Sequence, residues 1–305
     1  MQTSDPNWPR ASAWLAGEHL PETDGLIAVL GAPLNHSITP GGCDKAPAAV
    51  RRCLERLSTY SFDLDLDVRR LEMRDAGDLA IQASKPEEAL EPIVSHLSSL
   101  LHEADAVVLL GGDNGITRPG CHGLDLPLEN IGLITLDAHL DLRDLDGGLH
   151  NGNPVRQLLQ DGLPGNQIIQ IGIQSFANSR PYAEVARSAG ISVVHSELVH
   201  KHGLSKILTD SLADLSSRVE AIYVDLDLDV MDRCFAPATP GSRPGGVAPW
   251  QLRQAARLCG LSPKVRVMDL VEIDPDRDIA EATSFAAAEC LLSFASGVLA
   301  RKLTA

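Results

Sequence analysis

Two stretches of the sequence bring acidic side chains together in alternating positions. In the first, Asp137, His139 and Asp141 follow the apolar run Ile131–Leu136, which is typical of a buried parallel strand. If the extended backbone continues through them, the three side chains point to one side, because successive residues of an extended chain face opposite ways. Two carboxylates and an imidazole at a strand end have the composition of a metal site, although a solvated acidic loop would also explain this stretch taken alone.

The second stretch, residues 221–232, repeats this arrangement. Asp225, Asp227 and Asp229 alternate with leucines, so the end of another strand carries three carboxylates on one edge. Carboxylates this close repel one another unless protons or cations compensate their charge. Two such clusters in one chain therefore predict a divalent-metal centre that is shared between two strands.

The elements that would position these clusters alternate between strand and helix. Sequence patterns predict strands at 26–30, 71–79, 106–110, 131–136, 167–173, 191–194 and 264–273, besides the strand that begins at 221. They predict helices at 47–57, 86–102, 154–159, 182–189, 205–219, 250–258 and 280–303. This alternation indicates an α/β fold with a parallel sheet covered on both faces. Residues 1–24 are expected to form a lead-in and residues 25–305 a single domain, because the sequence has no internal repeat or long linker.

The positions of the clusters agree with this fold. In an open parallel sheet, ligands bind beyond the carboxyl ends of the strands. Both acidic clusters follow their strands on that side, and so does the glycine-rich segment Gly111–Gly115 after the strand 106–110. This agreement favours a functional site over a solvated acidic surface.

Composition limits the kinds of binding partner and the cellular compartment that we expect. The chain has 305 residues, 44% of them hydrophobic and 22% charged, and a formal net charge of -15. Nucleic acids and anionic membranes need a basic footprint, so neither is an expected partner. The 6 cysteines are scattered without a Cys-x-x-Cys pair, the N-terminus has no apolar signal region, and we expect no membrane span of ~20 apolar residues. We therefore expect a soluble, cytoplasmic protein.

The motifs together resemble a known family. Residues 137–141 (Asp-Ala-His-Leu-Asp) and 227–232 (Asp-Leu-Asp-Val-Met-Asp) resemble the paired signature of the ureohydrolases, which include arginases, agmatinases, guanidinobutyrases and formimidoylglutamases. Residues 111–114 (Gly-Gly-Asp-Asn) resemble the Gly-Gly-Asp-His segment of the family. Residues 269–275 (Asp-Leu-Val-Glu-Ile-Asp-Pro) resemble its Asp-x-x-Glu-x-Asn-Pro stretch.

This resemblance implies a fold, a cofactor and a reaction. The fold would be a three-layer α/β/α sandwich, and two Mn²⁺ ions bridged by a hydroxide would hydrolyse a small amidine or guanidine substrate. Asp137 and Asp227 would bridge the metals. His139 and Asp229 would complete the shell of one ion, and Asp141 would serve the other. The resemblance also implies a homotrimer or a homohexamer.

Glu272 would hold or orient the cationic substrate through charge-assisted hydrogen bonds. Its alternative role is that of a surface carboxylate at a strand end.

One departure from the family pattern concerns the first metal site. The family usually has a histidine ligand where this chain has Asn114. A neutral amide oxygen binds Mn²⁺ more weakly than imidazole, so we expect the ion beside Asn114 to be labile. The alternative is that Asn114 caps the loop and the enzyme works with one ion.

A second departure concerns the residue that passes a proton to the leaving amine. The family commonly has a His-Gly-x-Pro stretch, whereas here an extra residue separates His150 from Gly152. Either His150 or Asn151 therefore takes that place. An imidazole with a pKa of about 6.5 is suited to this transfer, so the sequence favours His150.

Substrate choice is expected from loops that read the far end of the molecule. Formimidoylglutamate carries two carboxylates and would need donors at the pocket mouth. The loops offer four arginines for this purpose, Arg118, Arg143, Arg180 and Arg243. Agmatine ends in an ammonium group and would need carboxylates such as Asp144 and Asp146, although Asp144 and Arg143 would also be able to pair. The sequence slightly favours formimidoylglutamate.

Two other functions stay open. A metal-binding relative with a weakened site and little turnover would share these motifs, but the retained His139 and Glu272 count against it. A zinc hydrolase of the deacetylase type would use a related sheet. The second cluster, which is rich in carboxylates and has no histidine, favours Mn²⁺ over Zn²⁺.

Overall fold

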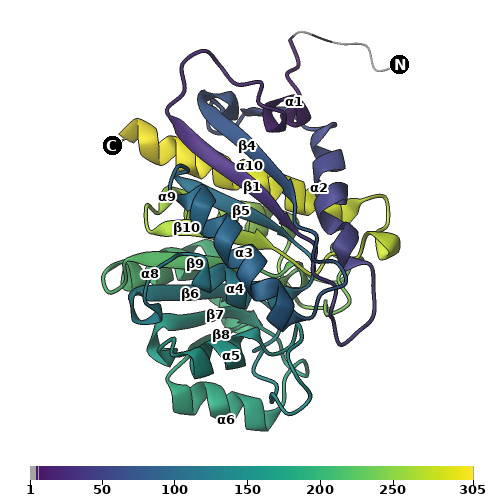
Figure 1. Ribbon diagram of the computed structural model, residues 1–305, viewed down its shortest axis with the longest axis vertical. Coiled ribbons are helices and arrows are strands. Elements are labelled where there is room, and N and C mark those ends of the chain that lie inside the picture. The colour runs from purple at the N-terminus through teal and green to yellow at the C-terminus, as the bar shows by residue number, and fades with distance from the viewer. Residues whose placement is uncertain (1–4, 6, 305) are drawn as a thin grey trace.

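The computed structural model describes residue 5 and residues 7–304; residues 1–4 and 6 of the predicted lead-in, and residue 305, lie outside it. Its centre is an 8-stranded parallel sheet in the order β4-β1-β5-β10-β9-β6-β7-β8 (Figure 1). The strands are β1 (Gly25–Ala32), β4 (Leu71–Asp78), β5 (Ala106–Gly111), β6 (Ile131–Leu136), β7 (Ile168–Ile173), β8 (Ser192–His195), β9 (Ala221–Leu226) and β10 (Val265–Leu270). The predicted parallel sheet is confirmed.

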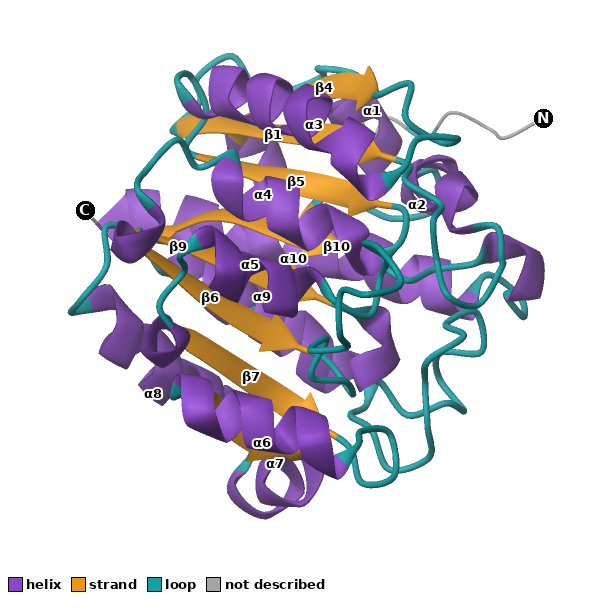
Figure 2. Ribbon diagram, turned by 60° about the horizontal axis from the view of Figure 1, so that its bottom comes forward, coloured by secondary structure: helices purple, strands orange, loops and turns teal. Residues whose placement is uncertain are grey.

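Helices cover both faces of this sheet. One face carries α3 (Pro86–Leu101), α4 (Thr117–His122), α5 (Pro154–Asp161) and α6 (Arg180–Ala189), which lie in front of the strands in Figure 2. The other face carries α1 (Ala11–Leu15), α2 (Ala46–Leu54), α7 (Ser196–His202), α8 (Leu204–Ser216), α9 (Pro249–Leu261) and α10 (Ala282–Thr304). Each face of the sheet has its own apolar core. The three-layer α/β/α fold that the resemblance implied is confirmed.

The central strands are continuous apolar runs because both of their faces are covered. Every residue of β5, β6 and β9 is buried. The long helix α10 is apolar for the same reason. By length and composition alone it could span a membrane, but 72% of its most apolar window is buried against the rest of the protein, as in a core helix. The expectation that the chain has no such segment overlooked this helix.

All predicted strands and helices have counterparts whose ends differ by a few residues. The sequence did not predict α4, α7 or the small antiparallel hairpin of β2 (Tyr60–Ser61) and β3 (Leu66–Asp67), which are too short to show a clear period. In the predicted lead-in, Trp14 of α1 is fully buried and its indole N–H donates to the carbonyl of Leu71 at 2.9 Å. This segment therefore packs against the sheet edge.

Because the sheet is parallel, the carboxyl ends of all its strands lie at one edge, where the long loops gather (Figure 2). The neighbours β6 and β9 are in register up to their last residues, Leu136 and Leu226. The N–H of Asp227 then donates to the carbonyl of Leu136 at 3.1 Å. The two acidic clusters therefore begin at the same level, although about 90 residues separate them in the chain.

Candidate active site

A cavity of about 450 Å³ opens at this edge of the sheet. Loops that follow β1, β6, β7, β9 and β10 line it. Four of its lining residues are predicted site residues with acidic side chains: Asp141, Asp227, Asp229 and Glu272. His139 lines it as well, so one cavity holds side chains from both predicted clusters.

Two of the cavity's lining residues, His139 and Asp229, form a compact group with the buried Asp137. Each offers a ligand atom, and these atoms all lie within 4.8 Å of one another. Nδ1 of His139 lies 2.8 Å from Oδ2 of Asp229 and 3.5 Å from Oδ1 of Asp137. Two carboxylates and an imidazole at this spacing can hold a divalent metal.

The backbone that positions the side chains of both clusters forms turns and does not continue as a strand. Strand β6 ends at Leu136, and Asp141 has a φ of +51°, so the extended backbone assumed for residues 137–141 is not present. The Asp137 carboxylate instead accepts from the N–H of His139 at 2.6 Å. In the second cluster, the Asp227 carboxylate accepts from the N–H of Asp229 at 2.8 Å, at the start of a short 3-10 helix. The side chains converge because their backbones curl around carboxylates.

The charges of this group are not balanced by the protein itself. Oδ2 of Asp137 is buried and has no hydrogen-bond partner among the described residues. Burial and the charge of Asp229 raise the pKa of Asp137 to about 7. Burial, Asp229 and Asp137 raise the pKa of Asp227 well above its usual range. A bound cation would satisfy the orphaned oxygen and the repelling carboxylates, so the residues fit a metal centre.

His139 is held as a cation in the absence of a metal. Burial on its own would lower the pKa of the imidazole, but Asp229 and Asp137 outweigh burial and raise it to about 12. A metal that binds here must therefore displace a proton from His139, which makes binding pH-dependent.

Asp225, the third carboxylate of the second stretch, lies outside this group. It is the second-last residue of β9, is fully buried and lies beside Asp269. Burial and the charge of Asp269 raise its pKa well above the usual range. No arginine pairs with it in the described part of the chain.

Asn114 and Asp141 form a second, looser half of the centre. The side-chain amide of Asn114 donates to Oδ2 of Asp141, and its backbone N–H donates to Oε1 of Glu272 at 2.9 Å. Its side-chain oxygen, the atom that could bind a metal, accepts from the hydroxyl of Thr117 at 2.6 Å. For this oxygen to face an ion beside Asp141, the amide would have to turn over.

Glu272 lies between this half and the cavity. Its φ of +63° is unusual for a residue with a side chain, and such conformations concentrate at functional sites. Its Oε1 accepts from the N–H of Asn114 and, at 3.0 Å, from the side-chain amide of Asn151. Burial and the charge of Asp113 raise its pKa to about 8.

The structure places the two candidates for the proton-transfer position differently. Asn151 lines the cavity and contacts Glu272. His150 does not line it: its Nδ1 accepts from the N–H of Gly152 at 3.0 Å, and its Nε2 lies 3.3 Å from the side-chain amide of Asn153. Burial and Arg143 lower the pKa of the His150 imidazole. Asn151, the alternative to His150 left open by the sequence, therefore contacts Glu272, whereas the role of His150 in proton transfer stays a prediction.

Two of the four candidate arginines are engaged elsewhere. Arg118 pairs with Asp161 at 2.6 Å, and Arg180 pairs with Glu184 at 3.0 Å. Arg143 and Arg243 line the cavity instead. The Arg143 guanidinium makes no ion pair with Asp144 or any other described carboxylate, whereas Arg243 donates to the carbonyls of residues 241 and 242.

Several lining residues were given no role in the site from the sequence. The backbone at Gly241 passes so close that an added Cβ would lie 2.1 Å from Oδ2 of Asp229 and 2.9 Å from Cε1 of His139. In the sequence, only the glycine of Thr-Pro-Gly (239–241) indicated that the backbone could pass this close. Asn178 also lies at the cavity and accepts from the N–H of Leu140 at 2.8 Å, but its sequence context carries no signal.

Comparison with known proteins agrees with this geometry. The sequence profile of the arginase family matches residues 26–296. A formimidoylglutamase of Halalkalibacterium halodurans is 38% identical over 291 residues, which cover 92% of this chain and 91% of that protein. An agmatinase of Pyrococcus horikoshii is 30% identical over 283 residues, which cover 91% of this chain and 93% of that protein.

Solved structures give the same result. The formimidoylglutamase of Bacillus subtilis superposes with a TM-score of 0.89 at 28% identity, covering 98% of this chain and 94% of that chain. The formiminoglutamase of Trypanosoma cruzi with Mn²⁺₂ superposes with a TM-score of 0.86 at 26% identity, covering 96% and 99%. The chain therefore belongs to the arginase family, the ureohydrolases, and is a hydrolase that acts on carbon–nitrogen bonds of linear amidines.

Proposed function

We propose that this protein is a manganese-dependent formimidoylglutamase that hydrolyses formimidoylglutamate to glutamate and formamide. The observation that carries the proposal is the distribution of charge in the cavity. Its buried end holds the carboxylates of Asp141, Asp227, Asp229 and Glu272, and its exposed rim holds the guanidinium groups of Arg143 and Arg243. A substrate with a cationic amidine at one end and carboxylates at the other matches this polarity.

The same polarity disfavours agmatine. Its ammonium end would face two arginines, and like charges at close range are unfavourable. Asp144 and Asp146, the carboxylates that agmatine would need, do not line the cavity. The 38% identity with a formimidoylglutamase over most of both chains supports the choice independently.

We propose that two Mn²⁺ ions bind at the acidic end. Asp137 and Asp227 would be shared between the ions, His139 and Asp229 would hold one, and Asp141 with Asn114 would hold the other. The donor set, the orphaned oxygen of Asp137 and the Mn²⁺ in the Trypanosoma cruzi relative support this assignment. Bound Mn²⁺ would lower the pKa of a water molecule so that hydroxide is available near neutral pH.

The chain's own side chains would place the substrate. The Glu272 carboxylate is buried beside the cavity and would accept hydrogen bonds from the amidinium N–H groups. Asn151 would hold Glu272 in place through its 3.0 Å hydrogen bond, with its own oxygen fixed by the N–H of Ile38 at 2.9 Å. An amide cannot carry a proton, so Asn151 would orient Glu272 rather than shuttle protons.

A panel of substrates tests the proposal. The protein is loaded with Mn²⁺ and assayed with formimidoylglutamate, agmatine, arginine and guanidinobutyrate, and formamide and urea are measured. We expect the highest kcat/KM with formimidoylglutamate, and a loss of that preference in Arg143→Ala. Faster hydrolysis of agmatine would overturn the substrate assignment.

A second candidate function follows from Asn114. Because its side-chain oxygen is engaged by Thr117, a metal-binding relative that retains one ion and turns over slowly would show the same geometry. Inactivity across the whole panel, with one ion bound per chain, would support it.

We further propose a cytoplasmic location and a homotrimer or homohexamer. Neither nucleic acid nor membrane is an expected partner, in line with the net charge of -15. The six reduced cysteines, five of them buried, suit a reducing compartment. Light scattering after size exclusion measures the assembly directly.

A further inference from the structure

Phe176 is an unusual residue in the loop after β7. Among the described large apolar side chains it is the most exposed, at 105% of its reference area, with Phe62 next at 88%. Its backbone has a φ of +65°, a conformation that side chains rarely adopt. Unusual backbone conformations concentrate at functional sites, so the surroundings of this ring bear on whether it has a function.

The loop around Phe176 is hydrogen-bonded to residues 138–140, the segment that contains His139. The N–H of Gln174 donates to the carbonyl of Ala138 at 3.0 Å. The side chain of Asn178 accepts from the N–H of Leu140 at 2.8 Å and donates to the carbonyl of Ala138 at 3.0 Å. Both sides of Phe176 are therefore tied to the residues that flank His139, and the ring between them is not packed.

Phe176 also lines the cavity, together with one other exposed apolar side chain. Ile38, in the loop after β1, is 44% exposed and lies against Gly152, where an added Cβ would be 2.9 Å from Cδ1 of Ile38. The remaining exposed groups of the rim include Arg143 and Arg243. The mouth therefore combines two apolar side chains with two guanidinium groups.

We propose that Phe176 determines specificity by covering the methylene section of the substrate, with Ile38 as its counterpart. This inference rests on the proposed function for the nature of the substrate. Formimidoylglutamate places methylene carbons between the amidine, which belongs at the buried acidic end, and the carboxylates, which belong at the arginine rim. The exposed ring would then lose its contact with water when substrate binds.

Kinetics of Phe176→Ala test this role. We expect KM for formimidoylglutamate to rise about tenfold, the scale of a lost apolar contact with one methylene group. Formamidine has no methylene section, so its kcat/KM should stay unchanged. Phe176→Leu should restore most of the affinity. An equal effect on both substrates, or none on either, would overturn the proposal.

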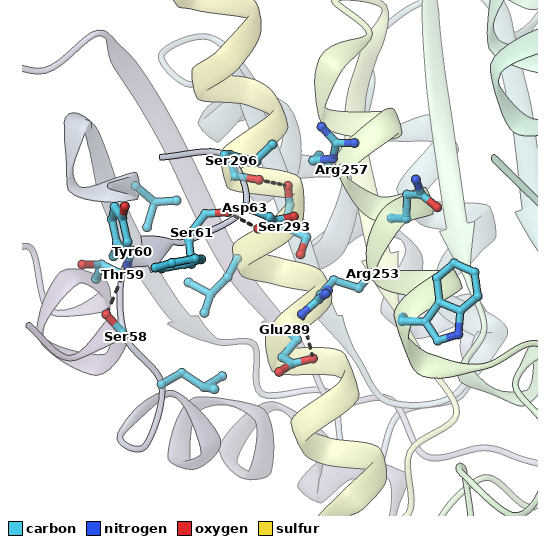
Figure 3. A pocket seen from close by; sticks show the side chains of 17 residues that line it. Ser58, Thr59, Tyr60, Ser61, Asp63, Arg253, Arg257, Glu289, Ser293 and Ser296 are labelled. Atoms are coloured by element: carbon cyan, nitrogen blue, oxygen red, sulfur yellow. Dashed lines mark hydrogen bonds and ion pairs between the residues drawn. The ribbon is translucent and has the colours of Figure 1, made fainter. Parts of the chain in front are cut away.

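Phe62→Ala is the matched control. Phe62 is similarly exposed but belongs to the hairpin loop that lines a separate cavity of about 620 Å³ between that loop, α9 and α10 (Figure 3). That cavity shares no lining residue with the active-site cavity. Phe62→Ala should leave both substrates unaffected, and a change in KM equal to that of Phe176→Ala would count against a specific role.

A spectroscopic measurement is independent of turnover. In Phe176→Trp, emission should shift to the blue when glutamate, the product, is added, since the indole leaves water; Phe62→Trp should not respond. An unshifted Phe176→Trp spectrum at saturating glutamate would contradict the proposal. If the panel shows agmatine as the substrate, the proposed function fails, but agmatine and methylguanidine then give the same comparison for Phe176.

Discussion

The two halves of the acidic centre differ in how their buried polar groups are satisfied. The ligand atoms of Asp137, His139 and Asp229 lie within 4.8 Å of one another, and one buried oxygen of Asp137 has no hydrogen-bond partner in the part of the chain that the structure describes. Asn114 and Asp141 instead satisfy one another and are completed by Thr117. The first half gains most from a cation, whereas the second must give up hydrogen bonds to accept one. Similar chemistry at one sheet edge can therefore lead to unequal metal affinity.

The largest effect is expected from the compact half. Asp229→Asn removes a charge that both His139 and the metal need, so kcat/KM should fall on the order of 10³-fold or more, with loss of bound metal. Asp141→Asn should cost less, roughly 10- to 100-fold, because we expect the second half to hold its proposed ion more weakly. Steady-state kinetics and elemental analysis of the metal measure both. Equal losses would remove the distinction between the halves, and Asp210→Asn, an exposed carboxylate paired with Lys206, is the control.

The next effect concerns the amide that supports Glu272. Asn151→Ala removes a hydrogen bond to a buried carboxylate, which should lower kcat/KM roughly 10- to 100-fold. His150→Ala should leave kcat and KM close to those of the unaltered enzyme, because its imidazole faces its own loop. A large fall in kcat at constant KM for His150→Ala would instead restore the preference drawn from the sequence.

The number of metal ions bound per chain tests the expected difference in affinity between the two halves. After dialysis without added metal, we expect about one Mn²⁺ per chain, and two after loading. Asn114→His should retain the second ion, with an affinity increased by about tenfold or more, because imidazole is the stronger ligand. Two tightly held ions in untreated protein would refute the expected lability.

The smallest effect is on stability. In metal-free protein the pKa values of Asp137 and Glu272, about 7 and about 8, lie above their ordinary values of about 4. The folded state then binds more protons than the unfolded state between roughly pH 4 and pH 8, so the free energy of unfolding falls as pH rises. The raised pKa of His139 acts in the same direction above about pH 6.5.

Thermal unfolding in EDTA, followed from about pH 5.5 to about pH 7.5, measures this slope, which is at most about 1.4 kcal/mol per pH unit for each group. Mn²⁺ should remove most of it. Asp137→Asn should flatten the slope, and Asn114→Ala should not. A metal-free protein that becomes more stable as pH rises would contradict the repulsion described for the compact half.

The sequence was informative where one pattern repeats over many residues. The apolar runs of β5, β6 and β9 predicted buried parallel strands, and their parallel order placed both acidic clusters at one edge. Alternation was a poorer guide beyond the strand ends. It implied an extended chain through Asp141, whereas carboxylates that cap their own turns curl the backbone there.

Side-chain placement in loops depends on contacts that no local pattern encodes. His150 was preferred for its chemistry, but its imidazole hydrogen-bonds within the loop, and Asn151 takes the place beside Glu272. The sequence offered Arg118 as a substrate ligand, but the fold pairs it with Asp161, which is 43 residues away in the chain. The isolated ring of Phe176 had no sequence signal at all.

The strand order of the sheet has a consequence for how the enzyme is made. β10 comes last in chain order among the eight strands of this sheet, yet it occupies the middle of the sheet, between β5 and β9. The Asn114 loop follows β5, and the Asp227 loop follows β9 on the other side of that gap. Until β10 has been synthesised and inserted, the two flanks cannot be joined, and long-range pairing of this kind is slow. We therefore expect the proposed metal centre to be completed only after β10 has been inserted, and truncation before residue 265 should leave a chain that cannot assemble it.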